Sequence, residues 1–162
     1  MTLAEAFPNL RFEIQDLQLV TQRATGVIND QPQQLKDRIC IRAHDFFEPQ
    51  PVHGAAVYLL RMIIHDWADK EARQIISNVA SAMSEDSILL IMDTVLPDPG
   101  QVLATKERVL RSRDLTMMQT FNAKERSLDD WKDILTGDTY NLQLKDVNQP
   151  TGSHMNLLVV KK

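Results

Sequence analysis

Short apolar runs separated by longer amphipathic segments constrain the fold of this chain more than any other feature. The runs have the alternating or continuous apolar pattern of strands, and between them apolar residues recur at the spacing of a helix. This order favours an α/β fold, with a mostly parallel sheet flanked by helices. The expected strands are 10–17, 38–45, 55–61 and 88–93, and the expected long helices are 70–83 and 105–121.

The remaining segments carry more local signals. Residues 22–37 are polar and contain a glycine and a proline, so we expect a loop or a short helix there. Ser127 precedes two acids and an apolar period, which predicts a helix with Ser127 as its N-cap and Trp131 in the core. Residues 142–147 and 155–160 are expected to form a closing antiparallel strand pair.

Composition excludes several classes of protein. A net charge of −4 with scattered Lys and Arg argues against nucleic acid as a partner, because phosphate binding needs a concentrated basic surface. No apolar stretch approaches the ~18 residues of a membrane span, and no signal layout opens the chain. The single cysteine, Cys40, excludes an internal disulfide, while His44, His53 and His154 lack metal-ligand spacing. We expect one cytoplasmic domain over residues 1–162, with no metal.

Acids recur where the expected strands leave the sheet. Asp16, Asp45 and Asp93 each close a strand, and His65 follows a fourth. In open α/β sheets, ligands bind beyond the carboxyl ends of the strands. Any one of these acids could instead be a helix N-cap or a solvated loop residue. Their repetition favours one shared cleft.

His65 is the strongest single candidate for chemistry. It ends an apolar run, and the unperturbed pKa of histidine, ~6.5, lets the imidazole accept a proton at neutral pH. A structural alternative stays open, because Asp66 and Asp69 follow and a helix begins there. In that case His65 would only cap the helix.

A family likeness rests on motifs distributed along nearly the whole chain. The chain resembles the catalytic domain of the S-adenosylmethionine-dependent O-methyltransferases of the caffeate, flavonoid and fungal polyketide type, and the fungal members look nearest. The elements are moderately specific alone and highly specific in this order. They lie at 3–12, 15–17, 44–47, 60–67, with its His-Asp-Trp, 90–93, and 122–127, with its Lys-Glu-Arg-Ser.

The resemblance implies a fold and an activity. The fold would be the Rossmann-like class I methyltransferase sheet, incomplete at its N-terminal strand, with a C-terminal antiparallel strand pair. The activity would be transfer of a methyl group from S-adenosyl-L-methionine to a hydroxyl of a small phenolic or polyketide-like acceptor in secondary metabolism. Neither nucleic acid nor a membrane would take part.

The cofactor contacts implied by the resemblance come from the first strands. Asp16, with Leu17 beside it, would bind both ribose hydroxyls. Asp45 and Phe46 match the adenine-contacting pair, and Arg61 falls where the family has a basic residue near the cofactor.

The catalytic residues implied by the resemblance are His65, as general base, and Asp93 and Glu125, which flank it. Glu125 could instead form a surface ion pair with Lys124 or Arg126.

Met118 and Asn122 fall where the family contacts its substrate. Met117–Met118 and Phe121–Asn122 could equally be core packing.

One family motif is absent from the sequence. None of the five glycines forms the Asp-x-Gly-x-Gly turn that holds the cofactor's methionine part, and the helical N-terminal region is missing. We therefore expect weak cofactor binding unless another chain, either a second copy or a complementing chain, or a rearranged segment fills the gap. A tail of the first helix would dock through Leu3, Ala6, Phe7 and Leu10.

The sequence leaves two other functions to consider. A catalytically inactive methyltransferase-like remnant or binding module is the alternative to an active enzyme. A Rossmann-type dehydrogenase is disfavoured because no G-x-G-x-x-G follows a strand.

Overall fold

The computed structural model describes residues 1–137 and 140–162, which form two compact units, Met1–Glu48 and Pro49–Lys162. Each unit has its own sheet, so each is described by itself. The expectation of one domain over 1–162 stays a prediction.

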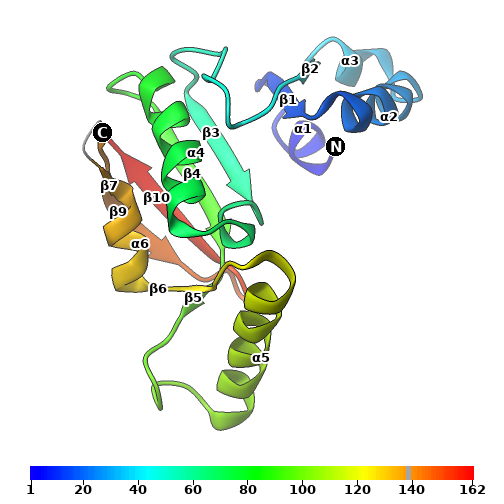
Figure 1. The fold of residues 1–162 in the computed structure, drawn as a ribbon. Coiled ribbons are helices and arrows are strands. Elements are labelled where there is room, and N and C mark those ends of the chain that lie inside the picture. The colour runs from blue at the N-terminus through cyan, green and yellow to red at the C-terminus, as the bar shows by residue number, and fades with distance from the viewer. Residues whose placement is uncertain (138–139) are drawn as a thin grey trace. The chain divides into compact units, whose positions relative to one another are not determined.

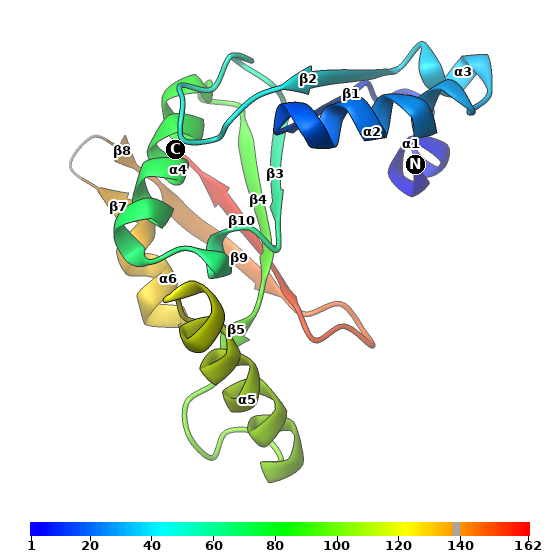
Figure 2. The same cartoon turned by 45° about the vertical axis from the view of Figure 1, so that its right-hand side comes forward.

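The first unit is a two-stranded parallel sheet with helices. Strands β1 (Phe12–Asp16) and β2 (Ile39–Ala43) pair in register from Phe12 opposite Ile39 to Asp16 opposite Ala43. Figure 2 shows α2 running alongside this pair. Both predicted strands are thus confirmed. The helices are α1 (Thr2–Ala6), α2 (Gln18–Asn29) and α3 (Gln33–Lys36).

The expectation for residues 22–37 was wrong in extent. Helix α2 begins four residues earlier, at Gln18, and continues through Gly26. A glycine inside a helix costs only about 1 kcal/mol, which packing can offset. Thr21 is buried in this helix, and the polar composition concealed the amphipathic pattern.

The expected docking of the N-terminal tail was also wrong. Its four apolar residues, Leu3, Ala6, Phe7 and Leu10, are all exposed. Instead, the Arg38 guanidinium donates hydrogen bonds to the carbonyl oxygens of three tail residues, which hold the tail. These acceptors are Ala4 at 2.6 Å, Leu10 at 3.0 Å and Phe7 at 3.2 Å.

The second unit is built on a four-stranded mixed sheet. The strand order is β3 (Val57–Arg61), β4 (Ile88–Asp93), β10 (Asn156–Lys161) and β9 (Gln143–Asn148). β3 and β4 are parallel, whereas β10 runs antiparallel to both of its neighbours. The predicted closing antiparallel pair is therefore confirmed. Helix α4 (Asp69–Ala82), also predicted, lies along one face of this sheet (Figure 1).

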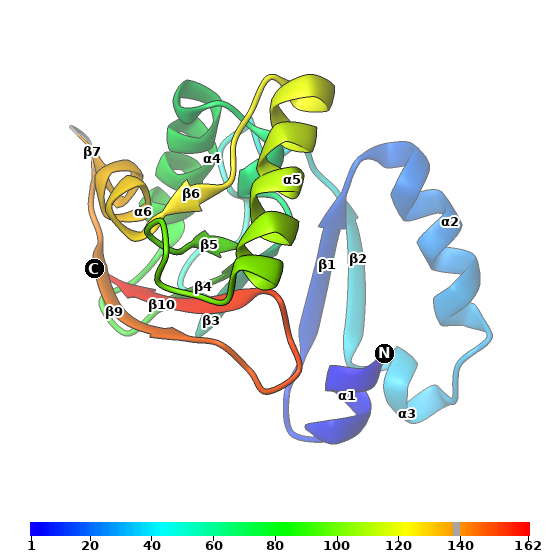
Figure 3. The same ribbon diagram turned by 90° about the horizontal axis from the view of Figure 1, so that it is seen from below.

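Shorter elements complete the second unit. A 3-10 turn, η1 (Ile64–Asp66), precedes α4. The predicted long helix is α5 (Ala104–Phe121), and the parallel pair β5 (Val95–Leu96) and β6 (Arg126–Ser127) lies between α5 and α6 (Figure 3). The remaining elements are α6 (Leu128–Leu135), β7 (Thr136–Gly137) and β8 (Tyr140–Asn141).

The start of α6 matches the sequence signal. The Ser127 side chain accepts a hydrogen bond from the Asp130 backbone N–H, and the Asp130 carboxylate accepts one from the Ser127 backbone N–H. This reciprocal pair satisfies two donors of the helix N-terminus. Trp131 is fully buried, as predicted, and its indole N–H donates to the Thr94 carbonyl oxygen at 3.1 Å.

The core of the second unit joins α4, α6 and the central strands. The fully buried apolar side chains include Ile75, Ile76, Leu89, Ile91, Trp131, Ile134 and Leu158.

Of the helices that the structure describes, none is both long and apolar enough to cross a bilayer.

Candidate active site

The position of His65 follows from how β3 ends. Arg61 pairs with Met92 of β4, so Asp93 emerges at the same sheet edge one residue later. Met62 then adopts a left-handed backbone, φ 53°, a conformation that non-glycine residues rarely take. This bend directs the chain into η1, where His65 is buried at the edge beside Asp93.

Three carboxyl groups surround the His65 imidazole. Nδ1 lies 3.2 Å from Oε1 of Glu125 and 3.8 Å from Oδ1 of Asp93, while Nε2 lies 3.5 Å from Oδ1 of Asp66. Only 8% of His65, 4% of Glu125 and none of Asp93 is exposed. The structure therefore brings together all three predicted catalytic residues. With Nδ1–H donating to Glu125, Nε2 is the nitrogen that can accept a proton.

The cluster changes the acidity of its members. The hydrogen bond to Glu125 raises the pKa of His65, and the Asp93 charge adds to this against the opposing effect of burial. Burial raises the pKa of Asp93 to about 7, with the Glu125 charge adding to it and the His65 charge opposing it. The Asp93 carboxyl therefore exchanges its proton near neutral pH, and the imidazole holds its proton more tightly than an ordinary histidine does.

The buried carboxyl oxygens are incompletely paired. Both oxygens of Asp93 and Oε2 of Glu125 lack a hydrogen-bond partner of good geometry among residues 1–137 and 140–162. The backbone amides of Ile64 and His65 lie close enough to Asp93 to lower its pKa, but burial outweighs them. An unpaired negative charge on a buried carboxylate is costly. These oxygens therefore favour a positive charge on the neighbouring imidazole.

Glu125 is held in place from a separate helix. Its backbone N–H donates to Oδ1 of Asp114 in α5 at 2.9 Å, a contact that the sequence did not suggest. The side chain then reaches His65, whereas Lys124 and Arg126 pair with Asp69. The surface ion-pair interpretation of Glu125 was therefore wrong.

The capping interpretation of His65 was also wrong. The residue before α4 is Ala68, and no side chain caps that helix. His65 instead lies in the preceding 3-10 turn.

The predicted cofactor residues of the first unit lie at one strand edge. Asp16 is the last residue of β1 and Asp45 follows β2, and both carboxylates are exposed. Oδ1 of Asp16 accepts from the Leu17 N–H at 2.8 Å, and Oδ1 of Asp45 accepts from the Phe47 N–H at 3.0 Å. These bonds fix the carboxylates at the carboxyl ends of two parallel strands. Phe46 is half-buried beside Phe47.

The two units are described separately. The shared cleft expected for Asp16, Asp45, Asp93 and His65 therefore stays a prediction, although the structure does bring Asp93 and His65 together within the second unit.

The remaining candidates lie in the second unit. Arg61 ends β3 and is exposed. Met118 is 56% exposed on α5, so the core-packing alternative fails for it. Asn122 closes α5 with a left-handed backbone, φ 53°, and its N–H bonds to the Met118 carbonyl oxygen. It therefore has a structural role as a helix cap, whatever else it contacts. Helix α5 packs against the η1 turn that carries His65.

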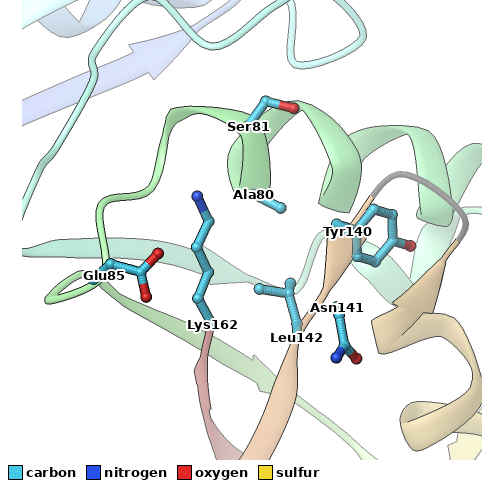
Figure 4. A pocket seen from close by; sticks show the side chains of 7 residues that line it. All are labelled: Ala80, Ser81, Glu85, Tyr140, Asn141, Leu142 and Lys162. Atoms are coloured by element: carbon cyan, nitrogen blue, oxygen red, sulfur yellow. The ribbon is translucent and has the colours of Figure 1, made fainter.

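One further cavity lies away from the candidate site. Within residues 1–137 and 140–162, no group of His, Cys, Asp and Glu could hold a metal ion. A cavity of about 330 Å³ lies near the end of α4, where Lys162 projects toward Ala80 and Glu85 and contributes to the lining (Figure 4). None of the candidate site residues lines it.

Comparisons with known proteins identify the family. A model of the O-methyltransferase domain matches residues 1–141. The chain belongs to this O-methyltransferase family. The predicted resemblance is thus confirmed, and so is the fold class, since the similar solved structures share this α/β architecture.

The relatives are considerably longer than this chain. The O-methyltransferase VdtC of Byssochlamys spectabilis is 48% identical over 99% of the chain, which spans only 37% of VdtC. LepI, solved in complex with SAM, is 32% identical with a TM-score of 0.82, over 98% of this chain and 38% of that one. The O-methyltransferase NcsB1, solved with S-adenosyl-L-homocysteine and 1,4-dihydroxy-2-naphthoic acid, is 25% identical with a TM-score of 0.80, over 99% and 44%.

Proposed function

We propose that this chain is the catalytic part of an S-adenosylmethionine-dependent O-methyltransferase that methylates a hydroxyl of a small aromatic or polyketide-like acceptor. His65 acts as the general base. The observation that carries this proposal is the buried imidazole whose Nδ1 lies 3.2 Å from Glu125 and 3.8 Å from Asp93.

The need for a base follows from the acceptor. A phenol has a pKa near that of tyrosine, ~10, so little of it is ionised at neutral pH. Nε2 of His65 would take the hydroxyl proton while the acceptor oxygen bonds to the methyl carbon. The bond from that carbon to the cofactor's sulfur would break in the same step, leaving S-adenosylhomocysteine. Glu125 and Asp93 would stabilise the imidazolium that results. Such proton transfer typically contributes ~10²–10⁴-fold to a rate.

The side chains at the carboxyl ends of β1 and β2 suit the ribose and adenine of the cofactor. S-adenosylmethionine supplies an electrophilic methyl group when it is bound. The exposed carboxylate of Asp16, beside Leu17, accepts hydrogen bonds from the ribose hydroxyls, and the carboxylate of Asp45 accepts one from the adenine amine. Phe46 offers the adenine an apolar contact, and Arg61 offers the cofactor a basic group. The SAM complex of LepI supports S-adenosylmethionine as the cofactor.

The acceptor would lie against α5. Met118 presents an exposed, polarizable side chain that suits a flat ring, and Asn122 offers a polar group one turn later. The aromatic diol bound by NcsB1 supports this class of acceptor. We propose that a second copy or a complementing chain completes the pocket.

A labelled-methyl transfer assay tests the function. The chain is assayed with S-adenosylmethionine and 1,4-dihydroxy-2-naphthoic acid, alone and with the unmatched portion of VdtC supplied in trans. His65→Gln should lower the rate at least ~10²-fold while calorimetry shows unchanged cofactor binding. His154→Gln, at an exposed histidine, is the control and should leave the rate unchanged.

Two results would count against the proposal. Cofactor binding without any transfer would favour the inactive, methyltransferase-like binding module. Transfer that survives in His65→Gln at the wild-type rate would show that another group removes the proton.

A further inference from the structure

The side chain next to Glu125 is a fully buried arginine. Arg126 has no exposed surface, and its guanidinium donates through Nη1 to the Ile64 carbonyl oxygen at 2.9 Å and through Nη2 to that of Trp67 at 2.8 Å. Nε and Nη2 also donate to Oδ1 of Asp69 at 3.1 and 2.8 Å. The guanidinium carbon lies 5.7 Å from the centroid of the Trp131 ring.

These contacts bracket the candidate base. Ile64 precedes His65 and Trp67 follows it by two residues, so one guanidinium ties both ends of the turn that carries the imidazole. The turn's own hydrogen bonds are long, 3.2 Å from Asp66 N–H to Ile63 O and from Trp67 N–H to Ile64 O. A short 3-10 turn with such bonds is weakly stabilised by itself. Asp69, the first residue of α4, accepts the remaining hydrogen bonds of the guanidinium and so ties it to that helix.

Two adjacent residues thus hold His65 in different ways. Glu125 holds the ring through Nδ1, and Arg126 holds the backbone on either side of it. Glu125 directly precedes β6, and Arg126 begins it and pairs with Val95 of β5, two residues beyond Asp93. Asp93, Glu125 and Arg126 are therefore all joined through the backbone to the short β5–β6 pair.

A purely stabilising ion pair with Asp69 would be a weaker explanation for burying an arginine at position 126. Lys124 already pairs with the partly exposed Asp69, at 3.1 Å. Burying a second cation there brings a desolvation cost that often cancels its electrostatic gain. The planar fork is needed because a lysine ammonium cannot span the two carbonyls and the carboxylate in one fixed geometry.

We propose that Arg126 is a positioning residue for His65. Its guanidinium fixes the 64–67 turn so that Nδ1 stays on Glu125 and Nε2 faces the acceptor hydroxyl. The part concerning the acceptor rests on the proposed function, whereas the part concerning Glu125 does not.

The test compares Arg126→Met and Arg126→Lys with Arg73→Met. Arg73 is a matched control, because its guanidinium also binds a carboxylate, Asp133 at 2.6 Å, and a carbonyl oxygen, Thr136 at 2.7 Å. The first readout is an NMR titration of the histidine rings, with the His65 signal assigned by its loss in His65→Gln. Arg126→Met should lower the His65 pKa toward ~6.5, since the imidazole no longer stays on Glu125. Arg126→Lys should lower it partway, and Arg73→Met should not.

The second readout is methyl transfer. Loss of the fork should reduce kcat by about 10²-fold, the cost of a misplacement near 1 Å, and leave KM for S-adenosylmethionine unchanged. If the wild-type chain shows no transfer, the proposed function fails, and the titration alone still decides the role of Arg126.

The outcomes separate positioning from folding. A folded Arg126→Lys with the wild-type His65 titration and kcat would overturn the proposal. If Arg126→Met does not fold, Arg126→Lys decides the matter. If neither variant keeps a cooperative thermal transition, Arg126 is a folding residue and the positioning role is rejected.

Discussion

Glu125 and Asp93 place two buried acids beside the same imidazole nitrogen, Nδ1 of His65, and this arrangement gives the site its pH behaviour. Glu125 lies nearer to Nδ1 than Asp93 does, at 3.2 against 3.8 Å. Asp93, which is fully buried, is the acid whose pKa rises to about 7. Around neutral pH the folded protein therefore binds protons at this cluster that the unfolded chain has already released.

Replacing Asp93 with Asn tests this behaviour. Because the folded pKa of Asp93 is raised, the stability that it contributes is present below its ordinary value of 3.8 and is lost as pH rises through about 7. The wild type should therefore lose stability as pH rises from 5 to 8, whereas the variant should not. The difference in the free energy of unfolding between the variant and the wild type should grow in favour of the variant over this range, by on the order of a few kcal/mol. The pKa of His65 should also fall, since the Asp93 charge raises it.

Thermal melts at the two pH values and an NMR titration check both effects. Asp98→Asn, in an exposed turn, is the control and should show no pH-dependent gain. An Asp93→Asn variant that loses relative stability as pH rises would contradict the account.

At the scale of elements, local patterns predicted what local physics determines. The buried run of β4, the stripe of α4 and the Ser127 cap of α6 are each encoded within a few neighbouring residues. The full length of helix α2 is not predicted, because its polar residues and Gly26 are typical of a loop or a short helix.

The site was predictable only in part. Glu125 meets His65 across 60 residues of sequence, so the pairing came from the family resemblance and not from a local pattern. For Arg126, the sequence gives its place in the Lys-Glu-Arg-Ser element and a possible surface pairing with Glu125, but its position beside a candidate catalytic acid is a usable signal for a role at the site. Asp114 gave none, because it contacts the backbone of Glu125 from another helix.

The N-cap of α6 gives a prediction at this scale. Ser127→Ala removes the side-chain acceptor of the capping box and should cost about 1 kcal/mol. For a protein of this size, that corresponds to a melting temperature lower by roughly 2–4 °C, measured by circular dichroism. Ser112→Ala, on the exposed surface of α5, is the matched control and should not lower it, since Ala favours a helix. Equal shifts in both variants would show that the cap is not stabilising.

At the scale of the whole molecule, the two units differ in how much they bury. The first unit has two buried residues, Ala4 and Thr21, and a two-stranded sheet. The second unit contains the other buried residues of the described chain, on a four-stranded sheet. Since an isolated two-stranded sheet is marginal, the second unit should account for most of the stability.

Separate expression tests this difference. Residues 49–162 should unfold cooperatively on heating and keep the His65 titration of the whole chain, because Glu125, Asp93 and Arg126 all belong to that unit. Residues 1–48 alone should show no cooperative transition. A cooperative 1–48 with an unfolded 49–162 would reverse the assignment.

The central claim is that His65 removes the acceptor's proton, and a series of acceptors tests it most directly. Methyl transfer to phenols of decreasing pKa is measured at pH 7 for the wild type and for His65→Gln. The defect of His65→Gln should be largest, ~10²–10⁴-fold, for an acceptor with a pKa near 10, and it should vanish for one already ionised at pH 7. A defect of constant size across the series would contradict the claim, because the loss would then not concern proton removal.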